Sequence, residues 1–141
     1  MRRVPDLKSP WREAFEGRAD LSFEQAFDLG IELYEKGHPW HAHEVWEELW
    51  HDYKGPGRRS LQGLIQLAAA RHHAQNENAH GMRTLLERSL KNLSDGEGFK
   101  TLDKAALRES ISDLLSGLNS DALLDPGVFP TIGHRVDNPR N

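Results

Sequence analysis

The chain contains no cysteine, which excludes disulfide bonds and thiolate metal sites. It also lacks a long apolar run. The most apolar stretch, LIQLAAA at 64–70, includes a glutamine and is far too short to span a bilayer. The first ten residues, MRRVPDLKSP, hold two arginines with no apolar segment behind them. We therefore expect no signal peptide and a cytoplasmic protein.

An excess of positive charge is absent as well. The formal net charge is -4 at pH 7, so no global basic field attracts nucleic acid or an anionic membrane, and we expect neither as a partner. The length of 141 residues fits one ordinary domain that builds its core without disulfides or a structural metal. A hydrophobic content of 37% and a charged content of 28% are typical of a small soluble helical protein.

Strand-like alternation of apolar and polar residues occurs nowhere, whereas apolar residues at helical spacing are frequent. The segment from Ser22 to Gln25 is a capping-box pattern that begins a helix, and Gly37 supplies a left-handed stop. KGPG at 54–57 and NEN at 76–78 separate further helices. The sequence predicts helices over 23–36, 39–53, 58–75, 79–93 and 102–118. Because the connections are short, we expect an all-α, compact bundle of about five mostly antiparallel helices.

The predicted domain organisation is simple. We expect a single domain over 1–141, with an N-terminal arm at 1–20 and a helical core at 21–118. The remaining residues, 119–141, contain DPG, FP and NP and predict a coil tail that straps across the body.

The predicted second helix carries an unusual composition. Residues 38–50, HPWHAHEVWEELW, hold three histidines, three glutamates and three tryptophans. On a helical wheel its apolar face contains Trp46 and Trp50, while His43 and Glu47 lie at the edge of that face, one turn apart. Such residues border the core rather than lie at random on the surface.

The predicted third helix, 58–75, is apolar around nearly its whole circumference, which is typical of a central, buried helix. Gly63 in its middle indicates close approach of a neighbour. Gln62, Gln66 and His73 nevertheless fall in one narrow stripe. Because a buried amide without partners costs about 1–3 kcal/mol, we expect this stripe to meet a polar partner. The nearest one in sequence is the polar edge of the helix before it, with His43, Glu44 and Glu47 and with Trp46 and Trp50 as walls.

Three interpretations of this cluster remain open. In the structural one, the polar groups satisfy one another and fix the helix register. In the second, the cluster binds a small ligand through Gln62, Gln66, Trp46 and Trp50, or a divalent metal such as Zn, Mn, Fe or Ni through His43, Glu47 and His73. In the third, Glu44 acts as general base towards a metal-bound water in a hydrolase.

Two further possibilities lie outside the cluster. The outer surface of this helical hairpin would suit a protein-interaction module, whose partner would be another protein. The loop KGPGRRS at 54–60 offers a weaker anion site at a helix start, although ion pairs with acidic neighbours explain its two arginines more simply.

Three linked motifs, HAHEVWEELW, LQGLIQLAAARHH and N-x-x-x-x-G before a leucine-rich helix, resemble the domain-of-unknown-function family three-hundred-and-nine. The resemblance covers roughly residues 22–93. It implies a small all-helical protein of a mostly microbial family. Members of the family have been described as metal-dependent hydrolases, although no activity is established. The family elements H-E-x-x-E-x-x-W and L-Q-G-L-I-Q-L correspond here to His43, Glu44, Glu47 and Trp50, and to residues 61–67.

Overall fold

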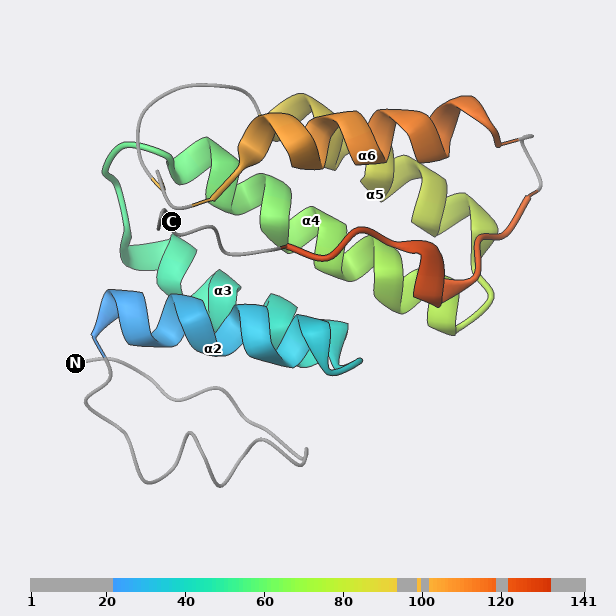
Figure 1. Ribbon diagram of the computed structural model, residues 1–141. Helices are drawn as coiled ribbons and strands as arrows, with labels where there is room; N and C mark the ends of the chain where they lie inside the picture. Colours follow the sequence, from blue (N-terminus) through green and yellow to red (C-terminus); the bar gives the residue numbers. More distant parts are fainter. Residues whose placement is uncertain (1–21, 94–98, 100–101, 119–121, 133–141) are drawn as a thin grey trace, which may run out of the picture.

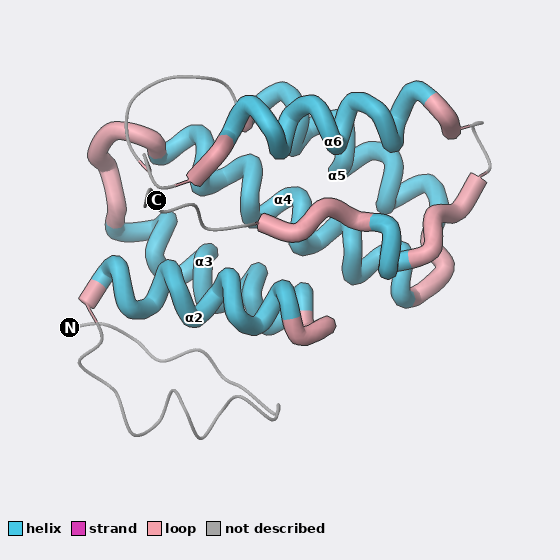
Figure 2. Tube along the Cα trace, viewed as in Figure 1, coloured by secondary structure: helices cyan, strands magenta, loops and turns pink. Residues whose placement is uncertain are grey.

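The computed structural model of the chain describes residues 22–93, 99, 102–118 and 122–132. In this part of the chain the regular elements are helical (Figure 2). They are α2 (Phe23–Glu35), α3 (Pro39–Asp52), α4 (Arg58–Gln75), α5 (Ala79–Asn92), α6 (Lys104–Ser116) and the short 3₁₀ helix η1 (Pro126–Val128). The predicted all-α fold is confirmed, and each α-helix begins and ends within two residues of the expected position.

Local capping explains why the helices begin where they do. Ser22 Oγ accepts the Gln25 N–H at 3.0 Å, and Gln25 Oε1 accepts the Ser22 N–H at 2.9 Å, so the capping box is complete. Gly37 follows α2 with φ 91°, a left-handed conformation that favours glycine. Asn78 Oδ1 accepts the Gly81 N–H at 3.0 Å and begins α5. These contacts satisfy backbone groups that the first and last turns leave without partners.

The fold is organised around α4. Consecutive helices from α2 to α6 pack on one another, and η1 packs on α4 as well (Figure 1). The buried residues of α4 surround most of its circumference: Ser60, Leu61, Gly63, Leu64, Ile65, Leu67, Ala68, Ala69, Ala70 and Ala74. The predicted close approach at Gly63 is confirmed, because a Cβ there would lie 2.8 Å from Leu93 Cγ at the end of α5.

Trp46 packs between α2 and α3 in a slot, which is the space left beside Gly30 of α2. Trp46 is fully buried, and its Nε1–H donates to Phe27 O at 3.1 Å. The indole fits because residue 30 is a glycine: a Cβ at that position would lie 2.1 Å from Trp46 Nε1. The absence of a side chain on α2 therefore sets how closely α3 packs against it.

Residues 122–132 run in front of α4 and contact the end of α2 (Figure 1). Phe129 and Ile132 are buried there, and the Tyr34 hydroxyl donates to Pro130 O at 2.9 Å. Burial raises the pKa of Tyr34. Arg71 of α4 links α2 to the segment 122–132, because its Nη1 donates to Tyr34 O at 2.6 Å and its Nε donates to Pro126 O at 3.2 Å.

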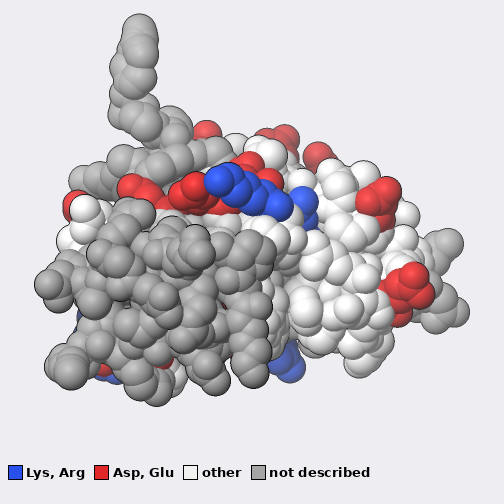
Figure 3. All heavy atoms as spheres, turned by 90° about the horizontal axis from the view of Figure 1, so that it is seen from below, with Lys and Arg blue, Asp and Glu red and all other residues white. Residues whose placement is uncertain are grey.

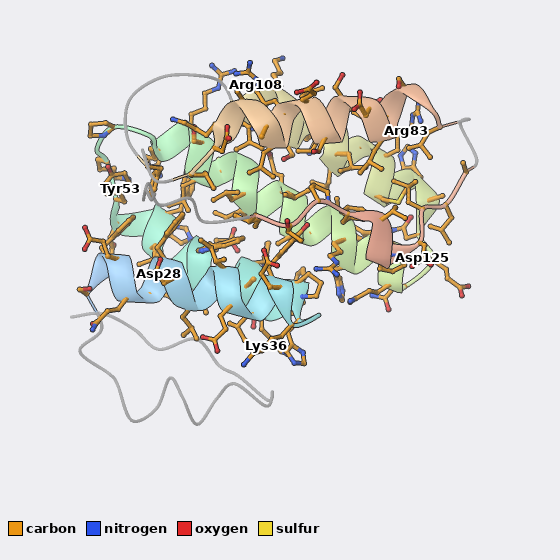
Figure 4. The ribbon with its side chains drawn as sticks, viewed as in Figure 1. Asp28, Lys36, Tyr53, Arg83, Arg108 and Asp125 are labelled. Atoms are coloured by element: carbon orange, nitrogen blue, oxygen red, sulfur yellow. The ribbon has the colours of Figure 1, made fainter. Side chains whose placement is uncertain are left out.

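Two short polar turns lie at opposite ends of the molecule. Asp125 Oδ1 accepts the Gly127 N–H at 2.9 Å and begins η1, while Tyr53 follows the last residue of α3 (Figure 4).

The predicted arm at 1–20 lies outside the described residues, as do 119–121 and 133–141 of the tail. Among the described helices, none is long and apolar enough to cross a membrane.

Replacement of Gly30 by alanine tests the slot for Trp46. The added methyl group would overlap the indole nitrogen, so the ring must move and its hydrogen bond to Phe27 O must break. We expect a loss of about 2–4 kcal/mol in the free energy of unfolding, from overpacking together with a buried N–H left unpartnered. Urea denaturation followed by circular dichroism measures this loss.

Gly117→Ala is the matched control. Gly117 follows α6 with φ -94°, and its Cβ would meet no atom closer than 4.0 Å. This variant should stay within about 0.5 kcal/mol of the wild type. Equal stability of the two alanine variants would contradict the account of the α2–α3 packing.

Candidate functional site

One side of α3 carries four aromatic and polar side chains alongside α4. The core side of the helix is formed by Ala42, Val45, Trp46 and Leu49. Beside it, at intervals of three or four residues, lie Trp40, His43, Glu47 and Trp50, which we name the α3 stripe. Its two ends contact α4 in antiparallel order, since Trp40 meets His72 and Trp50 meets Arg58.

The first end of the stripe is a stack of rings. Trp40 lies nearly parallel to His43, with ring centroids 4.4 Å apart and an interplanar angle of 14°. The His72 ring, from the last turns of α4, lies 4.8 Å from Trp40. Trp40 is 39% exposed, which makes it one of the few large apolar side chains open to water in the described part of the chain. An exposed indole face of this kind can stack on a ligand.

His43 and Glu47 form a pair one turn apart. His43 Nε2 lies 3.5 Å from Glu47 Oε1, and the two side chains are 15% and 47% exposed. A carboxylate beside Nε2 favours the ring proton on that nitrogen, which leaves Nδ1 as an acceptor. Nδ1 is buried and has no hydrogen-bond partner in the part of the chain that the structure describes.

The imidazoles around Trp40 are held in the neutral form. Burial lowers the pKa of His43, and His72 lowers it further, against the opposing effect of Glu47. Burial also lowers the pKa of His72, with His73 as a second cause. The pKa of His41 is lowered by burial and then by His38 and His72. These lowered pKa values favour the neutral form of the three rings.

At the second end of the stripe an arginine covers a tryptophan. The Arg58 guanidinium carbon lies 3.6 Å from the centroid of the Trp50 ring. Arg58 Nε donates to Tyr53 O at 2.7 Å, and Nη2 donates to Trp50 O at 3.2 Å, so the side chain also satisfies carbonyls at the end of α3. Trp50 Nε1 is buried and, among the described residues, has no hydrogen-bond partner.

The expected meeting of the α4 polar stripe with α3 is wrong for two of its members. Asn92 Nδ2 donates to Gln66 Oε1 at 2.8 Å, and His73 Nδ1 lies 3.1 Å from Asn78 Nδ2, so both side chains bind residues of the α5 side. Because Asn78 Oδ1 is occupied by the Gly81 N–H, its amide nitrogen is the donor to His73. Gln62 is partly buried on the same helix.

The expected ligand set of His43, Glu47 and His73 is accordingly not brought together. Within the described residues, no group of three or more His, Cys, Asp or Glu side chains is placed to hold a metal ion. Glu44, the candidate base, has Oε1 3.7 Å from His41 Nδ1. Trp46, expected as a wall of the site, packs in the core against α2.

Two residues of the site were missed by sequence reasoning. His72, not its neighbour His73, contacts the α3 stripe, and Trp40 forms the centre of the ring stack. The spacing of residues in the sequence indicates both contacts. Trp40, His43, Glu47 and Trp50 follow a spacing of three, four and three, and Arg58 and His72 are fourteen residues apart, which places them on one side of α4.

The lowered histidine pKa values predict how stability depends on pH. In the folded state the pKa values of His43 and His72 lie below the ordinary histidine value of 6.5, so the unfolded chain binds more protons in this window. Stability should therefore fall as the pH drops through 6.5, until it passes below the lowered values. Urea unfolding at pH 7.5, 6.5 and 5.5 measures the slope.

The double variant His43→Gln, His72→Gln removes two of the three rings whose pKa values are lowered. Its slope between pH 7.5 and 5.5 should be clearly flatter than that of the wild type. An unchanged slope would mean that other groups carry the pH dependence.

Comparison with known proteins gives one match. Neither a curated protein nor a solved structure matches the chain significantly. The family model Domain of unknown function (DUF309) matches residues 27–85, which span α2, α3, α4 and the first half of α5. The resemblance inferred from the sequence motifs is thereby confirmed: the part of the chain that carries the α3 stripe is similar to the family Domain of unknown function (DUF309).

Proposed function

We propose that the chain binds a small organic ligand along the α3 stripe. A single observation carries this proposal: His43 Nδ1 and Trp50 Nε1 are both buried, and neither has a partner among the described residues. Both belong to the same side of one helix. Buried polar atoms are almost always hydrogen-bonded, so two exceptions on one stripe call for an explanation. A ligand that supplies both missing partners provides one.

The chemistry of the stripe fits a small-molecule site. Such sites combine aromatic walls with a few polar groups that fix orientation. Trp40 and Trp50 supply the aromatic rings, and His43, Glu47 and the Trp50 N–H supply the polar groups. The two unpartnered nitrogens belong to residues seven positions apart, which corresponds to roughly 10 Å along the helix. That length suits a small organic molecule.

The metal-dependent hydrolase is less well supported. It requires three ligands that converge on one point, and His73 is directed to Asn78 instead of His43 and Glu47. The general-base role expected of Glu44 depends on that ligand set. We propose binding without an assigned reaction, and the cytoplasmic location stays a prediction from the sequence.

An NMR screen tests the proposal. The full chain is labelled with ¹⁵N and screened against several hundred organic fragments, with the tryptophan indole N–H signals as reporters. We expect hits that shift the Trp50 signal and the His43 ring signals. The Trp46 signal should stay in place, because its N–H already donates to Phe27 O. The absence of hits, or hits that move Trp46 as much as Trp50, would overturn the proposal.

Two matched variants and one metal control sharpen the screen. His43→Gln keeps a donor near Glu47 but loses the Nδ1 acceptor, whereas His43→Asn keeps an acceptor near the Nδ1 position. Hits should weaken in the first variant and persist in the second. Zinc chloride is titrated separately: joint shifts of His43 and His73 would favour the metal site over the proposed one.

A further inference from the structure

We propose that the ligand is an elongated zwitterion, with an ammonium or guanidinium group near His43 and Glu47 and a carboxylate near Trp50 and Arg58. This inference rests on the proposed function, because it names the chemical class that the α3 stripe would take. The two ends of the stripe differ in the hydrogen-bond partner that each one lacks. One end offers acceptors and the other offers a donor beside a positive charge.

The end at His43 is suited to a cation that carries N–H donors. Glu47 is 47% exposed and supplies a carboxylate. His43 Nδ1 supplies an unpartnered acceptor, since the carboxylate favours the ring proton on Nε2. Trp40 is 39% exposed and supplies an aromatic ring, to which a cation is attracted.

Reaching the two nitrogens requires side chains to move, because both atoms are buried. The ring stacked on His43 is Trp40, in the first turn of α3 and 39% exposed. In the proposed complex this indole rotates outwards and then covers the bound cation. The remaining members of the stack, His43 and His72, stay in position on their helices.

The end at Trp50 is suited to an anion. The indole Nε1–H is a donor only and has no partner among the described residues. The Arg58 guanidinium lies over the same ring, 3.6 Å from its centroid. A carboxylate that accepts the indole N–H would also lie close to this positive charge, and charge-assisted hydrogen bonds are the stronger ones.

Carboxylates of the surrounding hairpin lie near both ends of the stripe, so the basic residues at the start of α4 are what distinguish the two ends. The hairpin of α2 and α3 carries eight carboxylates against the single basic side chain of Lys36: Glu24, Asp28, Glu32, Glu35, Glu44, Glu47, Glu48 and Asp52. Carboxylates predominate on the described surface seen from the side of α2 (Figure 3). Basic residues gather instead at the start of α4, where Arg58 and Arg59 follow Lys54.

The helix dipoles do not reverse this preference. Each helix end carries about half an elementary charge, positive at the N-terminus and negative at the C-terminus. The first turn of α3 lies beside the last turn of α4, because Trp40 contacts His72, and the opposite ends meet through Arg58 and Trp50. The two dipoles therefore oppose each other at both ends, and the side-chain charges decide the orientation.

Three probes of matched chain length test the two ends separately. The probes are 8-aminooctanoate, octanoate and octylammonium, each titrated into the full ¹⁵N-labelled chain with the Trp50 indole N–H as reporter. The aminooctanoate chain approximates the roughly 10 Å between the two nitrogens. We expect 8-aminooctanoate to bind at least about tenfold more tightly than either probe that lacks one charge.

Two variants assign each charge to its partner. Glu47→Gln should weaken 8-aminooctanoate and octylammonium and leave octanoate unchanged. Trp50→Phe keeps the ring but removes the N–H, and the Trp40 indole N–H is then the reporter. This variant should weaken the binding of 8-aminooctanoate and octanoate and leave the binding of octylammonium unchanged. Circular dichroism of both variants shows whether each one is folded.

The outcomes separate this inference from the proposed function. If octanoate or octylammonium binds as tightly as 8-aminooctanoate, the zwitterion is wrong while the ligand site stands. The same holds if neutral fragments shift Trp50 and no charged probe does. If neither fragments nor probes shift Trp50, the inference and the proposed function both fail.

Discussion

The structure depends on the burial of α4. Leu61, Leu64 and Leu67 in this helix are fully buried, and each contributes about 1.5–3 kcal/mol relative to exposure. A helix that is apolar nearly all round must be covered on every side, so α3, α5 and the segment at 122–132 each take one side of it.

The α3 stripe follows from this arrangement. Ala42, Val45 and Leu49 point to the core. The α3 stripe, which is next around the helix, therefore lies beside α4 and contacts it at both ends. His43 and Trp50 lie there with one ring nitrogen each buried and unpartnered among the described residues. Such an atom costs about 1–3 kcal/mol, which is no more than the burial of one leucine, so the fold tolerates both. A ligand that satisfies them would recover that energy as affinity.

Local patterns predicted the helices because their causes are local. The capping box at Ser22 and the cap at Asn78 depend on residues three positions away, and the apolar circumference of α4 is visible in its own sequence. The predicted resemblance and the close approach at Gly63 likewise required no knowledge of the register between helices.

Side chains between helices were harder to place. His72 and His73 are adjacent in sequence and about 100° apart on a helix, and only the positions of α3 and α5 decide which neighbour each one meets. Trp46 and Trp50 share one apolar face, and the slot for Trp46 exists because α2 has a glycine opposite it. Phe99 lies in a connection with φ 55° and stacks on Phe27, and no periodic pattern indicates that contact.

A high-resolution crystal structure of the full chain, grown without small organic additives, tests the central claim most directly. The account predicts that no protein atom lies within hydrogen-bonding distance of His43 Nδ1 or Trp50 Nε1 in the protein without a ligand. A backbone or side-chain group from elsewhere in the chain that bonds to both nitrogens would contradict it, since the α3 stripe would then be part of the protein's own packing.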